Sequence, residues 1–250
     1  MNIVRVWEGT EVVFSIRFNK RQKRIIIRPS DTRRFLVTAP RSASRAMIGT
    51  VIDEHAHDLM KMEPPIDVLE EMIRTGNALV FGETRRLVFS ESVREPANTT
   101  SCLHVREGAQ GQRKKALKKQ FNTMLDATLS PVKHTLLRRL RLHDDDVEIG
   151  YRLMKSRFGS CNAVRKRITL NTELVHYPRR CSIYVLAHEL AHLIHPDHSS
   201  RFKATLASLV EDSEQTDRMM KTLRAHLLAG RFECFSETAA SWRDQTRRTT

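Results

Sequence analysis

The most informative stretch of the chain reads Val185-Leu-Ala-His188-Glu189-Leu-Ala-His192-Leu-Ile-His195-Pro196-Asp197-His198. His188 and His192 are four residues apart, so on a helix they lie one turn apart on one face, and their imidazole nitrogens can approach a single ion. Glu189 lies about 100° around the same helix, where its carboxylate can reach a water on that ion. The spacing matches H-E-x-x-H, the arrangement of zinc peptidases. The alternative is a buried helix whose histidines and glutamate are satisfied by other protein groups.

The third ligand of the predicted site has two candidates. A catalytic zinc ion takes three protein ligands and leaves one position for water. His195 lies on the same face as His188 but about 10 Å further along the axis, too far for all three rings to share an ion on a straight helix. Pro196 ends the helix and lets the chain turn back. We therefore expect His198 to be the third ligand of one Zn²⁺ ion.

Further residues around this helix form a recognisable pattern: Arg157-Phe-Gly-Ser-Cys-Asn162, then Asn171 with Leu174 and Pro178, then Tyr184 to His192, then His198-Ser199 and Phe202. Together they resemble the YgjP-like metal-dependent hydrolases, zincins that are similar to the SprT and WLM peptidases. The resemblance is strong over residues 155–202 and weaker over the β-rich N-terminal part. Phe158 and Lys203 stand where this family usually has tryptophan, at positions that look like packing.

The resemblance implies His188, His192 and His198 as metal ligands and Glu189 as the catalytic base. In this interpretation Glu189 takes a proton from the zinc-activated water and returns it to the leaving amine. The oxyanion needs a second stabiliser besides the metal. The candidates for that role are Tyr177, His176, Arg157 and Asn171, and Asn171 is alternatively a residue that holds a turn.

Two strands are predicted just before the active helix, at 147–154 and 167–171. In zincins an edge strand above that helix holds an extended peptide by backbone pairing, and a plain core hairpin is the alternative. Residues 159–161 are predicted to form a tight turn between these strands. Cys161 in this turn is a candidate near-site thiol that could block the metal or sense redox state. A small buried thiol that packs in the turn is the other interpretation.

The composition is that of a globular chain. Of 250 residues, 40% are hydrophobic, and 43 Lys+Arg against 29 Asp+Glu give a net charge of +14. No run approaches the ~18 apolar residues of a membrane-spanning helix. The first residues lack the apolar core of a secretory signal and the four cysteines form no CxxC pair, so we expect a cytoplasmic protein without disulfides. The positive surplus is typical of solvated basic surfaces, and an anionic nucleotide or nucleic acid as a further partner is the alternative.

The sequence predicts an α+β fold in three parts. Residues 1–110 form a β-rich N-terminal region, 111–230 a helical zincin-like metallopeptidase domain with a small antiparallel sheet, and 231–250 a polar C-terminal tail. Alternating apolar residues predict an antiparallel meander over 12–38. Predicted helices begin at Ser44 and span about 67–75, with Gly76 as the terminating residue. A basic helix follows after about residue 111, with Leu117, Phe121 and Leu125 at four-residue spacing, and a second one starts at Ser130-Pro131. Three more lie near 181–195, 199–211 and 214–229.

The function predicted from these observations is that of a zinc-dependent metallopeptidase acting on unfolded or extended polypeptides. Two alternatives remain open at this point. One is a metal-dependent hydrolase of nucleotide phosphoanhydrides, because the same activated water could attack phosphorus. The other is a nucleic-acid-associated module in which the metal is structural.

Overall fold

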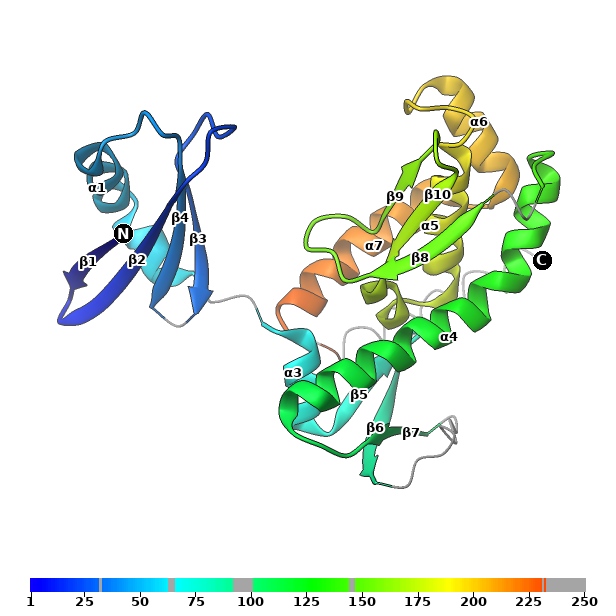
Figure 1. Ribbon diagram of the computed structural model, residues 1–250, viewed down its shortest axis with the longest axis horizontal. Coiled ribbons are helices and arrows are strands. Elements are labelled where there is room, and N and C mark those ends of the chain that lie inside the picture. Colours follow the sequence, from blue (N-terminus) through cyan, green and yellow to red (C-terminus); the bar gives the residue numbers. More distant parts are fainter. Residues whose placement is uncertain (32, 63–65, 92–100, 144–146, 231, 233–250) are drawn as a thin grey trace. The chain divides into compact units, whose positions relative to one another are not determined.

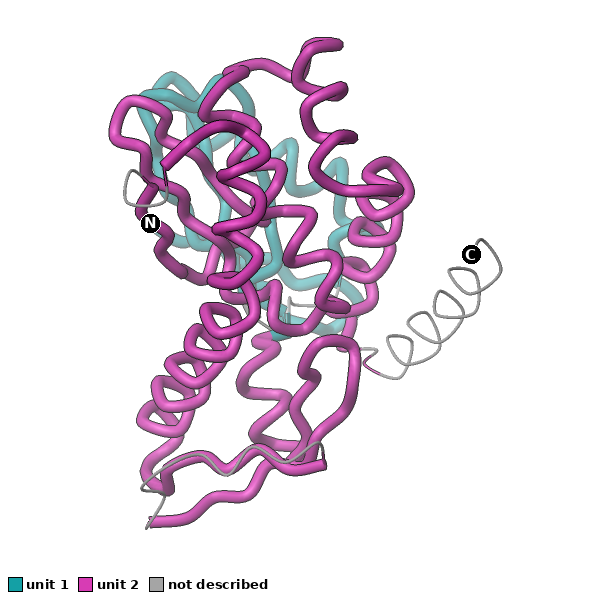
Figure 2. Tube along the Cα trace, turned by 90° about the vertical axis from the view of Figure 1, so that its right-hand side faces the viewer, with its two compact units in different colours: residues 1–66 teal, residues 67–250 magenta. Residues whose placement is uncertain are grey.

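The structure is a computed structural model that describes residues 1–250 except 32, 63–65, 92–100, 144–146, 231 and 233–250. The chain divides into two compact units, Met1–Ile66 (unit 1) and Asp67–Thr250 (unit 2), which Figure 2 shows in separate colours. Both units combine helices with small sheets (Figure 1), which confirms the predicted α+β class. The predicted polar tail, apart from Phe232, lies outside the described residues.

Unit 1 contains β1 (Asn2–Trp7), β2 (Thr10–Phe18), β3 (Ile26–Asp31), β4 (Arg34–Ala39), α1 (Arg45–Glu54) and α2 (Ala56–Lys61). Its four strands lie in the order β1-β2-β4-β3, and β4 pairs parallel with β2 and antiparallel with β3. The predicted antiparallel meander is therefore wrong. The parallel register sets Phe14 beside Phe35 and Ile16 beside Val37, so that all four apolar side chains are buried on one face.

Helix α1 covers that buried face. Its residues Ile48 and Ile52 are fully buried in the same core as Phe14 and Val37. The helix begins as predicted, because the Ser44 hydroxyl accepts a hydrogen bond from the Met47 backbone N–H at 3.1 Å. Unit 1 thus has one covered sheet face and one outer face.

Unit 2 begins with α3 (Val68–Thr75), β5 (Asn77–Val80), β6 (Glu83–Ser90) and β7 (Cys102–Arg106). Helix α3 ends at Gly76, whose φ of 68° is left-handed as a terminating glycine requires. The three strands form one sheet in the order β5-β6-β7. Leu79 and Leu103 of this sheet share a core with Leu117 of the following helix. The described residues 67–91 and 101–106 therefore pack with the second unit, whereas the sequence-based prediction grouped them with the N-terminal region.

Helix α4 (Gln110–Arg139) is one continuous helix of 30 residues. Figure 1 shows it extending from the β5–β7 sheet to α5. The prediction that a new helix starts at Ser130-Pro131 is wrong, because Pro131 lies inside α4. Buried leucines continue on both sides of it, at Leu129 and Leu136, and this shared apolar face outweighs the local cost of proline. Neither α4 nor any other described helix is long and apolar enough to cross a bilayer.

The remainder of unit 2 contains β8 (Glu148–Arg152), β9 (Gly159–Asn162), β10 (Arg167–Asn171), the 3-10 helix η2 (Thr172–His176), α5 (Arg179–Ala191), α6 (Ser200–Leu209) and α7 (Ser213–Leu228). The predicted strands and the three final helices are present. The sheet has the order β8-β10-β9, with β8 parallel and β9 antiparallel to β10, so it is mixed rather than antiparallel. Gly159 to Cys161, predicted as a turn, belong to the edge strand β9 because their backbone pairs with that of β10.

Candidate metal centre

The central helix α5 presents two of the predicted ligands on adjacent turns. Its apolar residues Leu186 and Leu190 are fully buried, which fixes the helix in the core. His188 lies in the last turn and His192 is the C-terminal cap. The next turn closes when the His195 N–H donates to the Ala191 carbonyl at 2.9 Å, after which Pro196 cannot extend the helix.

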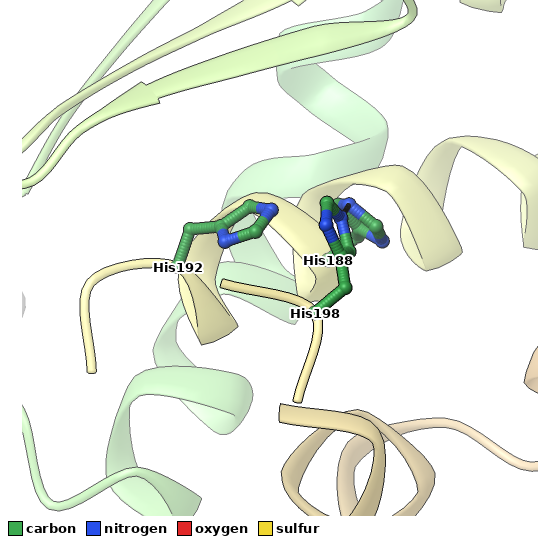
Figure 3. A group of neighbouring side chains, drawn as sticks. All are labelled: His188, His192 and His198. Carbon is green, nitrogen blue, oxygen red and sulfur yellow. Dashed lines mark hydrogen bonds between the residues drawn. The ribbon is translucent and has the colours of Figure 1, made fainter. Parts of the chain in front are cut away.

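The chain then turns back, and the His198 ring points toward His188 and His192 (Figure 3). The Nε2 atoms of His188 and His198 are 3.2 Å apart, and one ligand nitrogen of each of the three rings lies within 4.8 Å of the others. Two nitrogens bound at 2.0–2.1 Å to one tetrahedral ion are about 3.3 Å apart. The donor set therefore fits a zinc-sized cation. Within the described part of the chain, it is the one such group of three or more histidine, cysteine or acidic side chains.

His195, the other candidate for the third ligand, supports the site through its backbone. Its backbone carbonyl accepts a hydrogen bond from His192 Nδ1 at 3.0 Å. A carbonyl can only accept, so Nδ1 carries the proton and Nε2 keeps a free lone pair for a metal. The His195 ring itself lies 3.0 Å from the Thr205 hydroxyl on α6. This supporting role leaves no signal in the sequence, because the contact is made by a backbone atom.

Phe202 of α6 forms an apolar wall beside all three rings. Its ring centroid lies 4.9 Å from that of His188, 4.5 Å from that of His192 and 4.8 Å from that of His198. Burial, helped by the neighbouring His192 and His198, lowers the pKa of His188 to about 4. The ring is therefore neutral at pH 7, which is the protonation state that a metal ligand needs.

Glu189 lies beside His188 but faces the edge strand β9. Its side chain is buried, and it lies so close to Gly159 that a Cβ atom there would stand 2.6 Å from Oε1 and 2.7 Å from Cγ. Only glycine leaves room for the carboxylate at this point. A glycine inside a strand often marks such a close approach, so Gly159 is itself a signal in the sequence, although no local pattern links it to Glu189.

The environment of Glu189 also favours proton transfer. Burial raises the pKa of its carboxyl to about 7, while the positive charge of Arg157 acts in the opposite direction. A carboxyl group with a pKa near neutrality can both accept and release a proton. Arg157 is exposed on the loop before β9.

The sequence of the chain matches the model of the YgjP-like metallopeptidase domain over residues 23–223. The chain belongs to this family. Similar solved structures include the metallopeptidase zymogen of Pyrococcus abyssi abylysin, with 24% identity and a TM-score of 0.35 over 38% of this chain and 95% of that chain. The metallopeptidase zymogen of Methanocaldococcus jannaschii jannalysin has 20% identity and a TM-score of 0.33 over 39% and 95%. No curated protein matches the chain.

Three of the four candidate oxyanion stabilisers of this YgjP-like chain are buried and engaged elsewhere. The Tyr177 hydroxyl donates to Glu173 at 2.6 Å, and His176 Nδ1 lies 2.7 Å from the Leu79 carbonyl. The Asn171 amide donates to the Met154 and Arg157 carbonyls at 2.9 and 2.8 Å, so it holds the loop before β9. The structure thus shows the turn-holding alternative for Asn171, and only Arg157 remains near Glu189.

A buried charged network supports the same loop. Glu173 lies 3.4 Å from Arg224 Nε, and the Arg224 guanidinium also donates to the Lys155 carbonyl at 3.0 Å. Burial raises the pKa of Glu173, and the Tyr177 hydroxyl and the Arg224 charge oppose that shift. Phe158 packs edge-on against Tyr177 at 5.4 Å and beneath Arg224, in agreement with the expected packing role. No local pattern links η2 to α7, so the sequence analysis missed this network.

Cys161 lies in β9, opposite Ile168 of β10, rather than in a turn. Burial, together with the charge of Glu189, raises the pKa of its thiol to about 11. The thiol is therefore protonated at neutral pH, and a protonated thiol is a poor metal ligand and a poor nucleophile. This environment favours the packing interpretation over the redox one.

Proposed function

We propose that this member of the YgjP-like metallopeptidase family is a zinc-dependent peptidase that cleaves extended polypeptides, with Glu189 as its general base. The observation that carries the proposal is the convergence of the His188, His192 and His198 nitrogens, with the Glu189 carboxylate one residue away on α5. Zinc held by three histidines supplies Lewis acidity and lowers the pKa of a water in its open position.

Three residues of the site have separate roles in the proposed reaction. The Glu189 carboxylate accepts the proton of the attacking water and passes it to the amine that leaves. Gly159 sets the position of this carboxylate by allowing β9 to approach it closely. The Arg157 guanidinium is the candidate that can stabilise negative charge on the carbonyl oxygen as the tetrahedral state forms.

Two features support an extended polypeptide as the substrate. Strand β9 pairs with β10 on one side only, so its other edge can form backbone hydrogen bonds with a peptide. A cavity of about 1030 Å³ lies between α5, α6 and α7, and both His188 and His198 line it. Such a cavity can hold a side chain of the peptide next to the bond that is cleaved.

The substitution Glu189→Gln tests the proposal. It keeps the size of the side chain but removes the base, so we expect bound zinc to remain and peptide cleavage to fall about 10²- to 10⁴-fold. Zinc content is measured by elemental analysis and cleavage with a library of unfolded peptides. Glu211→Gln, an exposed acid-to-amide change on the same unit, is the matched control and should leave cleavage unchanged. Unchanged cleavage by Glu189→Gln would rule out the general-base assignment.

One observation favours a second candidate, the hydrolysis of nucleotide phosphoanhydrides. A pocket of about 300 Å³ beside β9 is lined by Arg152, Lys155 and Arg157 together with Ser160. These three cations can bind the phosphates of an anionic substrate, and the charge of one of them, Arg157, acts on the Glu189 carboxyl.

The two functions are separated by measuring phosphate release from nucleoside triphosphates and peptide cleavage on the same zinc-loaded preparation. The peptidase proposal predicts cleavage that is lost in Glu189→Gln, without phosphate release. Phosphate release that depends on Glu189 and falls in the double variant Arg152→Gln, Lys155→Gln would establish the second function instead.

A further inference from the structure

The most basic segment of the chain belongs to unit 1, whereas the residues proposed for catalysis belong to unit 2. Between Arg17 and Arg45 the sequence has ten lysines and arginines and one acidic residue, Asp31. All ten basic residues are exposed, and none of them forms an ion pair within the described part of the chain. Uncompensated like charges repel one another, so an anionic partner would stabilise this surface.

Four of these cations come together around a concave site. A cavity of about 460 Å³ is lined by Arg17, Phe18, Asn19, Lys20, Arg21 and Arg41, with no acidic side chain. The Asn19 N–H donates to the Ala39 carbonyl at 2.9 Å and its side chain accepts from the Arg21 N–H at 3.0 Å. These bonds tie the turn after β2 to the end of β4. The cations are therefore held on an ordered backbone rather than on a loose tail.

The outer face of the unit 1 sheet continues this positive surface. Phe14, Ile16 and Val37 point into the core, so their neighbours along the strands point outward, because side chains alternate across a strand. Arg17 and Arg34 are on this outer face, separated by about four residues or about 13 Å along the strands. The exposed Leu36 lies between them.

We propose that unit 1 binds single-stranded nucleic acid, with phosphates in the cavity at the end of β2 and along the outer sheet face, and with a base against Phe18, which lines the cavity. Cations spread over this distance match a chain of regularly spaced phosphates better than a single small anion. Phe18, 41% exposed within the cationic cavity, offers a ring on which a base can stack. The proposal concerns unit 1 alone and does not depend on the metal centre.

The test is fluorescence anisotropy of the full chain with a labelled 20-nucleotide single-stranded DNA of mixed sequence. Four phosphate contacts give a slope of about −3 for log affinity against log salt, so binding should weaken roughly 50-fold between 50 and 200 mM salt. The triple variant Lys20→Gln, Arg21→Gln, Arg41→Gln should bind more than tenfold more weakly at 100 mM salt and reduce the slope to about −1. Phe18→Leu should weaken binding roughly tenfold with the slope unchanged.

The matched control removes three exposed charges from α4 by Lys115→Gln, Lys119→Gln and Arg138→Gln and should change the affinity less than threefold. Equal losses in both triple variants would mean diffuse attraction and would overturn the proposal. Binding to vesicles with 30% anionic lipid, but not to the oligonucleotide, would assign the surface to a membrane instead. Because the readout is binding, Glu189→Gln should not affect it, which separates this test from that of the peptidase.

Discussion

At the residue scale, the metal centre depends on two backbone features rather than on the motif alone. α5 ends at Ala191, and Pro196 prevents the turn after it from continuing as a helix. The chain then turns back and places the His198 ring 3.2 Å from His188, nitrogen to nitrogen. The same turn aims the His195 carbonyl at His192 Nδ1. Both histidines after the helix thus contribute, one through its ring and the other through its backbone.

Replacing each of these two histidines by alanine separates their contributions. His198→Ala removes one of three proposed ligands, so we expect zinc affinity to fall more than 100-fold. His195→Ala keeps the backbone carbonyl and loses only the contact with Thr205, so its affinity should change about tenfold or less. Competition with a chromogenic chelator measures both values. The reverse order of affinities would show that the wrong histidine has been assigned.

The close approach of β9 to Glu189 leads to a second prediction. In Gly159→Ala the new Cβ would stand 2.6 Å from Oε1 of Glu189, so the carboxylate must move. We expect catalytic turnover to fall about 10²-fold with zinc retained, since the three atoms nearest to the new Cβ all belong to Glu189.

Gly150→Ala in β8 of the same sheet is the control for that change. Its nearest neighbour would be the Arg167 Nη2 atom at 3.9 Å, an ordinary contact. Turnover that falls equally in both alanine variants would indicate a general disturbance of the sheet rather than a displaced base.

At the element scale, α4 shows how packing overrides local propensity. Pro131 occupies an exposed position in the interior of a 30-residue helix, where proline costs about 3 kcal/mol relative to alanine. The helix continues because Phe121, Leu125, Leu129 and Leu136 form one apolar stripe that is buried along its whole length.

Pro131→Ala should therefore stabilise unit 2. Alanine stabilises the folded helix by about 3 kcal/mol relative to proline. This stabilisation is reduced by about 0.4–1 kcal/mol, because alanine also gives the unfolded chain more conformational freedom. We expect a net increase of about 2 kcal/mol in the free energy of unfolding, measured by urea denaturation. Ser130→Ala, one residue earlier in the same helix, should change it by less than about 0.5 kcal/mol. A destabilised Pro131→Ala variant would contradict this account of α4.

At the scale of the whole molecule, the chain consists of two units with separate cores. The core of unit 2 contains a buried histidine, His176, which makes the stability of this unit depend on pH. His176 contacts the Leu79 carbonyl and lies edge-on to Phe121, with centroids 5.2 Å apart. Burial lowers the pKa of His176 to about 4. The unfolded chain takes up this proton at the ordinary pKa of about 6.5. Between these two pH values the unfolded state binds more protons than the folded state, so unit 2 loses stability as the pH falls.

Because of this one residue, the free energy of unfolding of unit 2 falls by about 2 kcal/mol from pH 7 to pH 5. His176→Gln keeps a donor for the Leu79 carbonyl but does not titrate, so the pH dependence of its unfolding should be smaller by that amount. Urea unfolding of unit 2 in wild type and variant at both pH values measures it. Parallel pH profiles for the two proteins would contradict the assignment.

The sequence by itself determined the features that depend on neighbours within a few residues. These are the helical spacing of His188 and His192, the apolar stripe of α4, the Ser44 cap and the Gly76 terminus, because helix geometry relates residues three and four apart. The resemblance to the YgjP-like family, carried by the same local motifs, is confirmed by the family match.

Only the tertiary structure decided the order of the strands, the contact between Gly159 and Glu189, and the burial of Tyr177, Asn171 and His176. Each of these depends on residues far apart in the chain. The partner of Glu173 is Arg224, 51 residues away, and the partner of His176 is Leu79, 97 residues away. Local pattern indicates which side chains are able to form hydrogen bonds, but the tertiary packing decides which groups they meet, because a buried polar atom without a partner costs free energy.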